Sequence, residues 1–467
     1  MNDTPSSALY RAVWRWHFFA GLFVAPFAVF LAVTGSLYLW KPQFEEWQYR
    51  DLFNIAVPAG ATALTPDAQL AAARAALPAL NPVQFIPAPA PSRSSEIQFG
   101  AARGADKVSV FVNPYTGAVL GRIDDATRPM RILHDLHGTL LAGTAGEIVV
   151  ELVASWAFVL IVSGLYLWWP RPFTVRGFLL PRFGAGRRAL LRDLHAVPAV
   201  WLSAFTLFLL STGVQWTPVG GKWARTLAQL AGEWQPRETA ASAHRSELLG
   251  GWSPYLDSKA KAEQAATVAS TPPAGADPHA EHRGGGGRFT DNPARLSLGR
   301  VMAIAAERGV TDPYAIALPQ GPAGVYSVIT DRNRPFSRAF VHLDQYSGKV
   351  LADIRYKDFG QLGKFYSFGI IAHEGQLFGL ANQLLGLLTC LGLICLAVTG
   401  VAMWRSRRPA GQLAAPTAPR LFATSRGAVA IALGLSFLLP LMAASLLMLL
   451  GLDLLLGRRL THLPDRA

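Results

Sequence analysis

The sequence predicts an α-helical integral membrane protein made of two parallel repeats and a fifth, C-terminal transmembrane helix. Its 467 residues are 51% hydrophobic and only 16% charged, with a mean hydropathy of +0.26, which lies outside the soluble range. Five segments contain the roughly 20 apolar residues that a bilayer span requires. Because the first four fall into two matching pairs, we expect each repeat to be a transmembrane helix, an α+β domain outside the membrane and a second transmembrane helix.

The second and fourth spans carry the same side chains in the same register. Each stretch begins with a histidine, His137 or His373, and we expect His373 to stand at the head of a long apolar helix. The shared residues that follow are Leu141, Gly143, Ser163-Gly164 and Trp168 in the first stretch, and Leu377, Gly379, Thr399-Gly400 and Trp404 in the second. Matches at five positions indicate a duplication.

The first and third spans match in the same way. The spacing from His17 to the dipeptide Thr34-Gly35 is identical to the spacing from His195 to Thr212-Gly213. The repeat unit is therefore a pair of spans with a domain between them, and the fifth span is an addition to it.

The charge pattern predicts the orientation in the membrane. Six arginines and no acid lie in residues 171–192, five arginines and no acid lie in residues 405–426, and Arg11 and Arg15 precede the first span. Positively charged loops stay in the cytoplasm, so the two long loops are expected outside. Arg458 and Arg459 disagree with an outside C-terminus, which leaves the side of that end open. The first apolar run is too long for a cleavable signal peptide.

These patterns divide the chain into segments. They are the cytoplasmic N-terminus 1–17, first span 18–40, first periplasmic domain 41–133, outer interfacial segment and second span 134–169, basic loop 170–196, third span 197–216, periplasmic region 217–372, outer interfacial segment and fourth span 373–404, basic loop 405–426, fifth span 427–456 and tail 457–467.

The two outside domains are predicted to share one small α+β design. The first has a helix over 65–77, with Thr65 as N-cap and Pro66 in the first turn, followed by short strands. The second, at 294–356, has a helix over 296–308 and a similar set of strands. Both contain a turn of the type Tyr-[Ser/Thr]-Gly-x-Val-Leu, in which Gly117 and Gly348 supply positive φ.

Residues 236–293 are rich in Ala, Ser, Pro, Gly and charge, and are predicted to form a disordered insert before the second domain. His279 and His282 in it belong either to a polar linker or to a weak metal-binding site. The two cysteines, Cys390 and Cys395, both lie within the fourth span but not on one helix face, and we interpret them as apolar filler.

Histidines at the span ends are the candidate functional residues. His17 and His195 are expected at one depth near the cytoplasmic face, and His137 and His373 at one depth near the outer face. Ionisable residues next to hydrocarbon are costly and usually functional, and neutral imidazole is an axial ligand of haem iron. The pattern therefore favours two haem b groups, each held by one pair; single interfacial histidines acting as polar anchors are the alternative.

Other residues near these histidines leave alternatives open. His134, one turn before His137, could replace it as a ligand, ligate in another state or form a hydrogen bond. Haem propionates could pair with Arg15, Arg192 and Arg131, and Glu374 could support His373. A straight helix from His137 to Trp168 would be about 46 Å long, so Gly143 and Gly146 are expected to break it.

The chain resembles the PepSY-associated transmembrane family of bacterial inner-membrane proteins. The motifs that carry the resemblance are W-R-W-H at His17, L-H-x-x-H-G-T-L-L at His134 and His137, D-L-H at His195, H-E-G at His373 and the two Tyr-[Ser/Thr]-Gly turns. The resemblance implies PepSY-like outside domains. It also implies a role in iron uptake similar to that of ferric-siderophore reductases, with electrons from the quinone pool or a cytoplasmic reductase reaching a ferric siderophore or other periplasmic ferric complex.

Three functions follow as hypotheses. The first is a di-haem transmembrane oxidoreductase, a ferric-siderophore or ferric iron reductase; the second is a membrane-anchored PepSY binding or regulatory protein without redox activity; the third is a transporter. Nucleotide, flavin and covalent haem motifs are missing from the sequence. The basic residues gather at membrane edges, which argues for the lipid bilayer and against nucleic acid as their partner.

Overall fold

The computed structural model describes residues 5–100, 107–169, 177–236, 239–246, 288–289, 292–311, 313–331, 333–408 and 433–460. The chain divides into two compact units. The helical unit comprises Met1–Leu39, Leu133–Leu227 and His373–Ala467, and the sheet unit comprises Trp40–Ile132 and Ala228–Ala372. Most of the predicted insert, including His279 and His282, lies outside the described residues.

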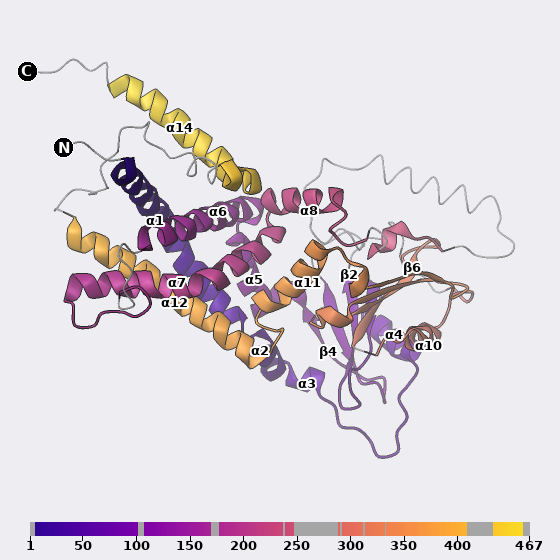
Figure 1. The fold of residues 1–467 in the computed structure, drawn as a ribbon. Helices are drawn as coiled ribbons and strands as arrows, with labels where there is room; N and C mark the ends of the chain where they lie inside the picture. The colour runs from indigo at the N-terminus through magenta and orange to yellow at the C-terminus, as the bar shows by residue number, and fades with distance from the viewer. Residues whose placement is uncertain are drawn as a thin grey trace, which may run out of the picture. The chain divides into compact units, whose positions relative to one another are not determined.

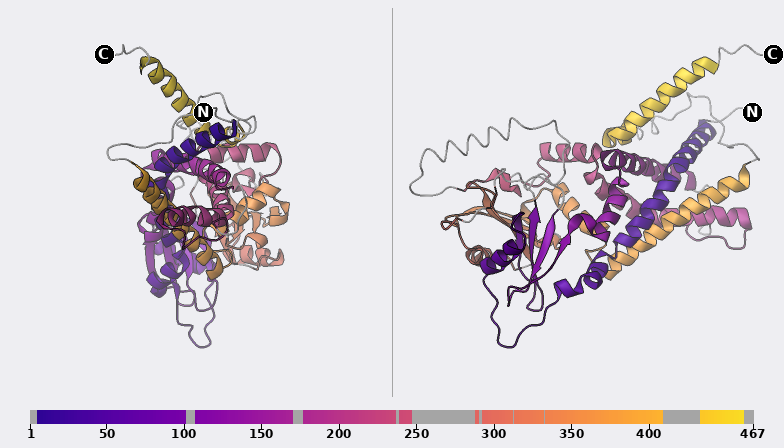
Figure 2. Two further views of the ribbon diagram at one scale, coloured as in Figure 1. Left: turned by 60° about the vertical axis from the view of Figure 1, so that its left-hand side comes forward. Right: turned by 180° about the vertical axis from the view of Figure 1, so that it is seen from behind.

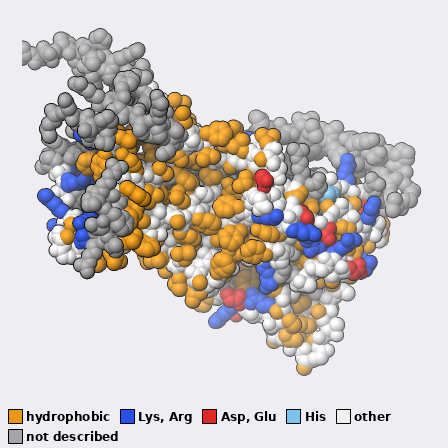
Figure 3. Space-filling view, viewed as in Figure 1, with side chains coloured by type: hydrophobic (Ala, Val, Ile, Leu, Met, Phe, Trp, Pro, Cys, Tyr) orange, Lys and Arg blue, Asp and Glu red, His pale blue; other side chains and the backbone are white. Residues whose placement is uncertain are grey.

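Among the described residues of the helical unit, four helices are long and apolar enough to cross a membrane (Figure 1). They are α1 (Pro5–Tyr38), α6 (Gly143–Trp168), α7 (Arg187–Gly213) and α12 (Leu380–Arg407). α1 and α7 each pack against both α6 and α12, as can be followed in Figure 2. Hydrophobic side chains dominate the visible surface of these helices in Figure 3, as expected for helices that face lipid.

The predicted fifth span falls partly outside the described residues. α14 (Pro440–Leu460) contains a shorter apolar stretch, Pro440–Leu449, and begins at Pro440, where a missing N–H is tolerated. It packs against α6, where Trp156 Nε1 donates to Ser445 Oγ at 3.2 Å. Within the described part of the chain, four helices qualify as spans, so a fifth spanning helix stays a prediction.

Two of the candidate histidines, His137 and His373, do not lie on the spans but on separate short helices. His137 is in the last turn of α5 (Pro129–Thr139), and His373 is the last residue of α11 (Gln361–His373). The expectation that His373 heads the long helix is therefore wrong. The chain turns first, with Leu140 and Leu141 at φ 51° and 56° before α6 and with left-handed glycines at positions 375 and 379 before α12.

The sheet unit contains one antiparallel sheet of eight strands in the order β4-β3-β2-β1-β5-β6-β7-β8. The first four strands are β1 (Asn81–Ile86), β2 (Ser95–Gly100), β3 (Val108–Val112) and β4 (Val119–Asp124). The others are β5 (Tyr314–Ala317), β6 (Val325–Thr330), β7 (Ala339–Asp344) and β8 (Val350–Arg355). The two sets, predicted as separate domains, join where β1 pairs with β5 through Phe85 and Ile316.

Each set of four strands has its own helix, α4 (Pro66–Ala76) or α10 (Leu298–Glu307), and both contribute to one hydrophobic core. Thr65 caps α4, because its Oγ1 accepts from Ala68 N at 3.3 Å. The two expected turns have Gly117 at φ 73° and Gly348 at φ 74°. The sheet unit is thus a symmetric pair of α+β halves around the β1–β5 seam.

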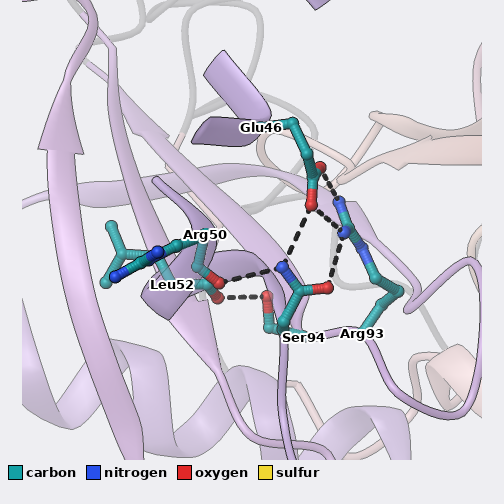
Figure 4. A network of polar contacts seen from close by, with 6 residues as sticks. Glu46, Arg50, Leu52, Arg93 and Ser94 are labelled. Atoms are coloured by element: carbon teal, nitrogen blue, oxygen red, sulfur yellow. Dashed lines mark hydrogen bonds and ion pairs between the residues drawn. The ribbon is translucent and has the colours of Figure 1, made fainter. Parts of the chain in front are cut away.

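A polar network attaches the segment that follows α1 to the strands. This segment contains α2 (Lys41–Gln48) and α3 (Arg50–Phe53). Figure 4 shows Arg93 bound to Glu46, with an N–O distance of 2.8 Å, and Ser94 Oγ donating to Leu52 O at 2.7 Å. The Arg93 guanidinium lowers the pKa of the Glu46 carboxyl. The network therefore holds α2 and α3 to the loop before β2.

The remaining elements are short. They are the α-helix α8 (Gly220–Leu230) and the 3-10 turns η1 (Asp125–Thr127), η2 (Val214–Trp216), η4 (Ala241–Ala243), η6 (Pro335–Ser337) and η7 (Tyr356–Asp358).

Candidate functional site: two facing histidine pairs

Four of the five candidate histidines form two facing pairs within the helical unit. His17 of α1 faces His195 of α7, with ring centroids 6.5 Å apart and ring planes at 90°. His137 of α5 faces His373 of α11, with centroids again 6.5 Å apart and planes at 86°. We call these the His17 pair and the His373 pair.

Every ring in these pairs is held through its Nδ1 atom by a neighbouring span. The Nδ1 atoms of His17 and His137 lie 2.9 Å from Ser163 Oγ and 3.0 Å from Thr34 Oγ1. Those of His195 and His373 lie 3.2 Å from Thr399 Oγ1 and 3.1 Å from Thr212 Oγ1. Across the described residues, no hydrogen bond involves Nε2 of these four rings, so each ring keeps its second nitrogen for another use.

The two pairs lie at opposite ends of the spans. α1 carries His17 of one pair and, near its other end, Thr34, which contacts His137 of the other pair. At a rise of about 1.5 Å per residue, these two positions are separated by about 25 Å along the helix. α7 repeats this arrangement with His195 and Thr212. The two pairs therefore lie towards opposite ends of helices whose length suits the ~30 Å thickness of a hydrocarbon core.

The fifth candidate, His134, is placed differently. Its side chain is 52% exposed, and its Nδ1 lies 3.1 Å from Asp135 Oδ1. Its ring contacts that of Tyr38 at a centroid distance of 5.9 Å. Of the two histidines in α5, His137 is therefore the one that faces His373.

The residues that the sequence suggests as support for the histidines do not all contact the two pairs. Arg192 is bound to the buried carboxylate of Asp193, with Nη2 3.0 Å from Oδ1. Thr212, and not Glu374, contacts Nδ1 of His373; Glu374 accepts from Gln376 Nε2 at 3.1 Å. Trp216 was not singled out from the sequence, and its ring lies edge-on to His373 at 6.1 Å.

The donor set fits an iron porphyrin better than a bare metal ion. A metal–imidazole bond is about 2 Å long and the nitrogen is about 1 Å from its ring centroid, so two imidazoles on one metal have centroids roughly 6 Å apart. Both pairs have this spacing. Among the described residues, no group of three or more His, Cys, Asp or Glu side chains could hold a metal. Two protein ligands suffice when a macrocycle supplies the others.

The sequence reasoning missed the function of the hydroxyl residues. In the sequence, their dipeptides stand out only as markers of the duplication; they are Thr34-Gly35, Ser163-Gly164, Thr212-Gly213 and Thr399-Gly400. The signal was available, because each dipeptide lies at a fixed distance from a histidine of its own repeat. Which histidine each one contacts depends on helix packing, which sequence spacing does not reveal.

The fold is that of a membrane protein with four apolar helices long enough to span a bilayer among the described residues, and paired histidines lie towards both ends of these helices. A family comparison agrees with this class, since the model of the PepSY-associated TM region matches residues 14–407. The chain belongs to this family, which links its membrane helices to PepSY domains. A search of curated proteins finds no match.

Proposed function

We propose that the protein is a haem-containing electron-transfer protein of the bacterial inner membrane that reduces ferric-siderophore iron on the periplasmic side during iron uptake. The observation that carries the proposal is the presence of two histidine pairs with equal spacing, one near each end of the same four spans. A histidine that only anchors a helix in the lipid interface needs no partner ring at this distance.

The four paired histidines would hold the haem iron. His17 and His195 would hold one haem b through Nε2, and His137 and His373 would hold a second. The supporting geometry is that Nδ1 of every ring is already occupied by a hydroxyl group. A bound haem supplies one-electron chemistry, with an iron that alternates between Fe(III) and Fe(II). In the proposed mechanism the spans would exclude water and keep the two pairs at fixed positions.

The direction of transfer follows from the orientation predicted by the charges. Arginines lie near the His17 pair, at Arg187, Arg188 and Arg405, and positive loops favour the cytoplasm. Electrons from the quinone pool or a cytoplasmic reductase would enter there and leave near the His373 pair. One electron converts Fe(III) of a siderophore to Fe(II), which hard oxygen donors hold less tightly, so the iron is released.

The main alternative is a membrane-anchored PepSY binding or regulatory protein without redox activity. It accounts for the sheet unit and the spans but assigns nothing to the His17 pair, at the end of the spans away from His137 and His373. The transporter hypothesis requires a binding site near the middle of the membrane. The hydroxyl–histidine contacts lie towards the span ends.

The test begins with the purified full-length protein in detergent. Dithionite should produce the visible α-band of reduced haem b, and adding ferrioxamine B should reoxidise it with formation of one Fe(II) per electron. His17→Ala should block re-reduction from the donor side, and His373→Ala should block reoxidation by the ferric complex. Colourless protein would refute the redox hypothesis. A haem protein that dithionite reduces but that ferric complexes do not reoxidise would refute only the proposed ferric substrate.

A further inference from the structure

We infer that the four Ser/Thr-Gly dipeptides are histidine seats: pairs of positioning residues that select the tautomer of each imidazole and set the angle of its ring. This inference rests on the proposed haem ligation and extends it to residues outside the ligand set. The seats are Thr34-Gly35, Ser163-Gly164, Thr212-Gly213 and Thr399-Gly400.

The hydroxyl group in each seat donates its own proton to a backbone carbonyl of the same helix. Thr34 Oγ1 donates to Phe30 O at 3.0 Å, and Ser163 Oγ donates to Val159 O at 2.6 Å. Thr212 Oγ1 and Thr399 Oγ1 donate to the carbonyls one helical turn earlier, at 2.9 Å and 2.7 Å. A hydroxyl has one proton and two lone pairs, so in this arrangement its oxygen can only accept from the histidine.

The histidine must therefore be protonated on Nδ1. In a neutral imidazole that choice leaves Nε2 with the lone pair, which is the form that binds a metal. His195 supports the assignment independently, because its Nδ1 also lies 3.0 Å from Leu396 O, and a carbonyl cannot donate. The seats thus prepare all four rings for ligation through the same nitrogen.

The glycine in each seat makes room for the ring. A Cβ atom added at Gly35 would lie 3.2 Å from His137 Cε1, and one at Gly164 would lie 3.2 Å from His17 Cε1. At Gly213 and Gly400 the corresponding distances, to His373 and His195, are 3.4 Å. These contacts are tighter than or at the limit of ordinary packing, so an alanine would require the ring to shift by a few tenths of an ångström.

The seats also account for the ring angles. Within each pair, the two rings are held by spans from different repeats: α6 and α12 for the His17 pair, and α1 and α7 for the His373 pair. Each ring is fixed by a hydroxyl contact at Nδ1, which in His195 is joined by Leu396 O, and by one glycine contact at Cε1. The planes consequently stand at 90° and 86° to each other.

The variants that test this inference are Thr212→Val and Gly213→Ala in the full-length protein. Valine keeps the shape of threonine but cannot accept a hydrogen bond. Thr389→Val is the matched control, since Thr389 is fully buried in α12 and its Oγ1 donates to Leu385 O without being a seat. Gly21→Ala is the control for glycine, because its nearest neighbour atom would be Leu160 Cδ2 at an ordinary 3.8 Å.

The readouts are the low-spin ferric EPR signal and the rate of haem transfer to apomyoglobin, neither of which depends on turnover. Perpendicular imidazole planes give a strongly anisotropic signal with a large maximum g value. Thr212→Val and Gly213→Ala should convert one of two such signals to a more rhombic type and weaken haem retention in that site by roughly 10–100-fold. Both controls should behave as the wild type.

Two failures can be told apart. Wild-type protein without haem would overturn the proposed function and the seats together. Wild-type protein with two haems, combined with seat variants whose signals and haem retention match those of the controls, would overturn the seats alone.

Discussion

Replacing the buried acid Glu151 should loosen the His373 pair without affecting the His17 pair. Glu151 lies in α6 and is 1% exposed; its carboxylate accepts from Val219 N at 3.0 Å and from Gly220 N at 2.7 Å. Gly220 is the first residue of α8 and Val219 precedes it, a few residues beyond the end of α7 that contains Thr212. Carboxylates at a helix N-terminus are stabilising, so this contact anchors the chain beyond the seat.

The cost of Glu151→Ala follows from these two bonds. A buried donor left without a partner costs about 1–3 kcal/mol, a penalty that applies in full to the buried Gly220 bond and only in part to the part-buried Val219 bond, so the two together cost at most about 2–6 kcal/mol. Part of this loss is recovered because the variant no longer buries a polar carboxyl group, so we expect about 2–4 kcal/mol. Gln215 Nε2 donates to Thr212 O at 3.1 Å. Through this hydrogen bond, loosening of the segment before α8 would also loosen Thr212 and its contact with His373.

The assay combines thermal unfolding in detergent, hydrogen exchange at residues 219–221 and EPR of the ferric protein. Glu151→Ala should melt earlier, exchange faster at those amides and broaden only the signal of the His373 pair. Glu147→Ala is the control, since Glu147 lies one turn earlier on α6 and forms no hydrogen bond or ion pair within the described part of the chain. Unchanged exchange and melting, or equal loss at both pairs, would refute the reasoning.

Three further predictions concern single contacts. Because Arg93 lowers the pKa of the Glu46 carboxyl, their ion pair contributes its full stability above the unfolded pKa of 4.5, and this contribution is lost as the pH falls through the folded pKa. Acid should therefore speed hydrogen exchange at the Ser94 amide in the wild type but not in Glu46→Gln. Gly348→Ala should lower the free energy of unfolding by about 1–3 kcal/mol, because φ is 74° and the new Cβ would lie 3.0 Å from the Leu296 and Ile304 side chains. Gly60→Ala should lower it less, because φ is 71° but the surrounding space is open. His134→Ala should keep the reduced α-band at full height, whereas His137→Ala should halve it; the opposite result would make His134 the ligand.

The spans and the pairing of histidines could be anticipated from sequence, because both depend on local or repeated patterns. Apolar length alone identifies α1, α6, α7 and α12, and the spacing from His17 to Thr34 is repeated from His195 to Thr212. The rise of about 1.5 Å per residue then gives the separation of these positions along each helix. It does not give the direction in which each side chain points across the bundle.

What sequence reasoning could not reach depends on contacts between distant residues. The two half-sheets join at Phe85 and Ile316, which lie in different repeats of the chain. The sequence of each half predicts a complete small domain, so it does not indicate that the two halves pair. The break between α11 and α12 depends on glycines that adopt positive φ within an otherwise apolar run. The pairing of Thr212 with His373 across two helices has the same long-range origin.

The central claim is that each histidine pair holds one haem, and the direct test is the haem-to-protein ratio of the purified full-length chain, measured by pyridine haemochrome and amino-acid analysis. The account predicts two haems per chain in the wild type, one in His17→Ala, one in His373→Ala and none in the double variant. A ratio that stays at two in either single variant, or a wild-type protein that binds no haem, would contradict it.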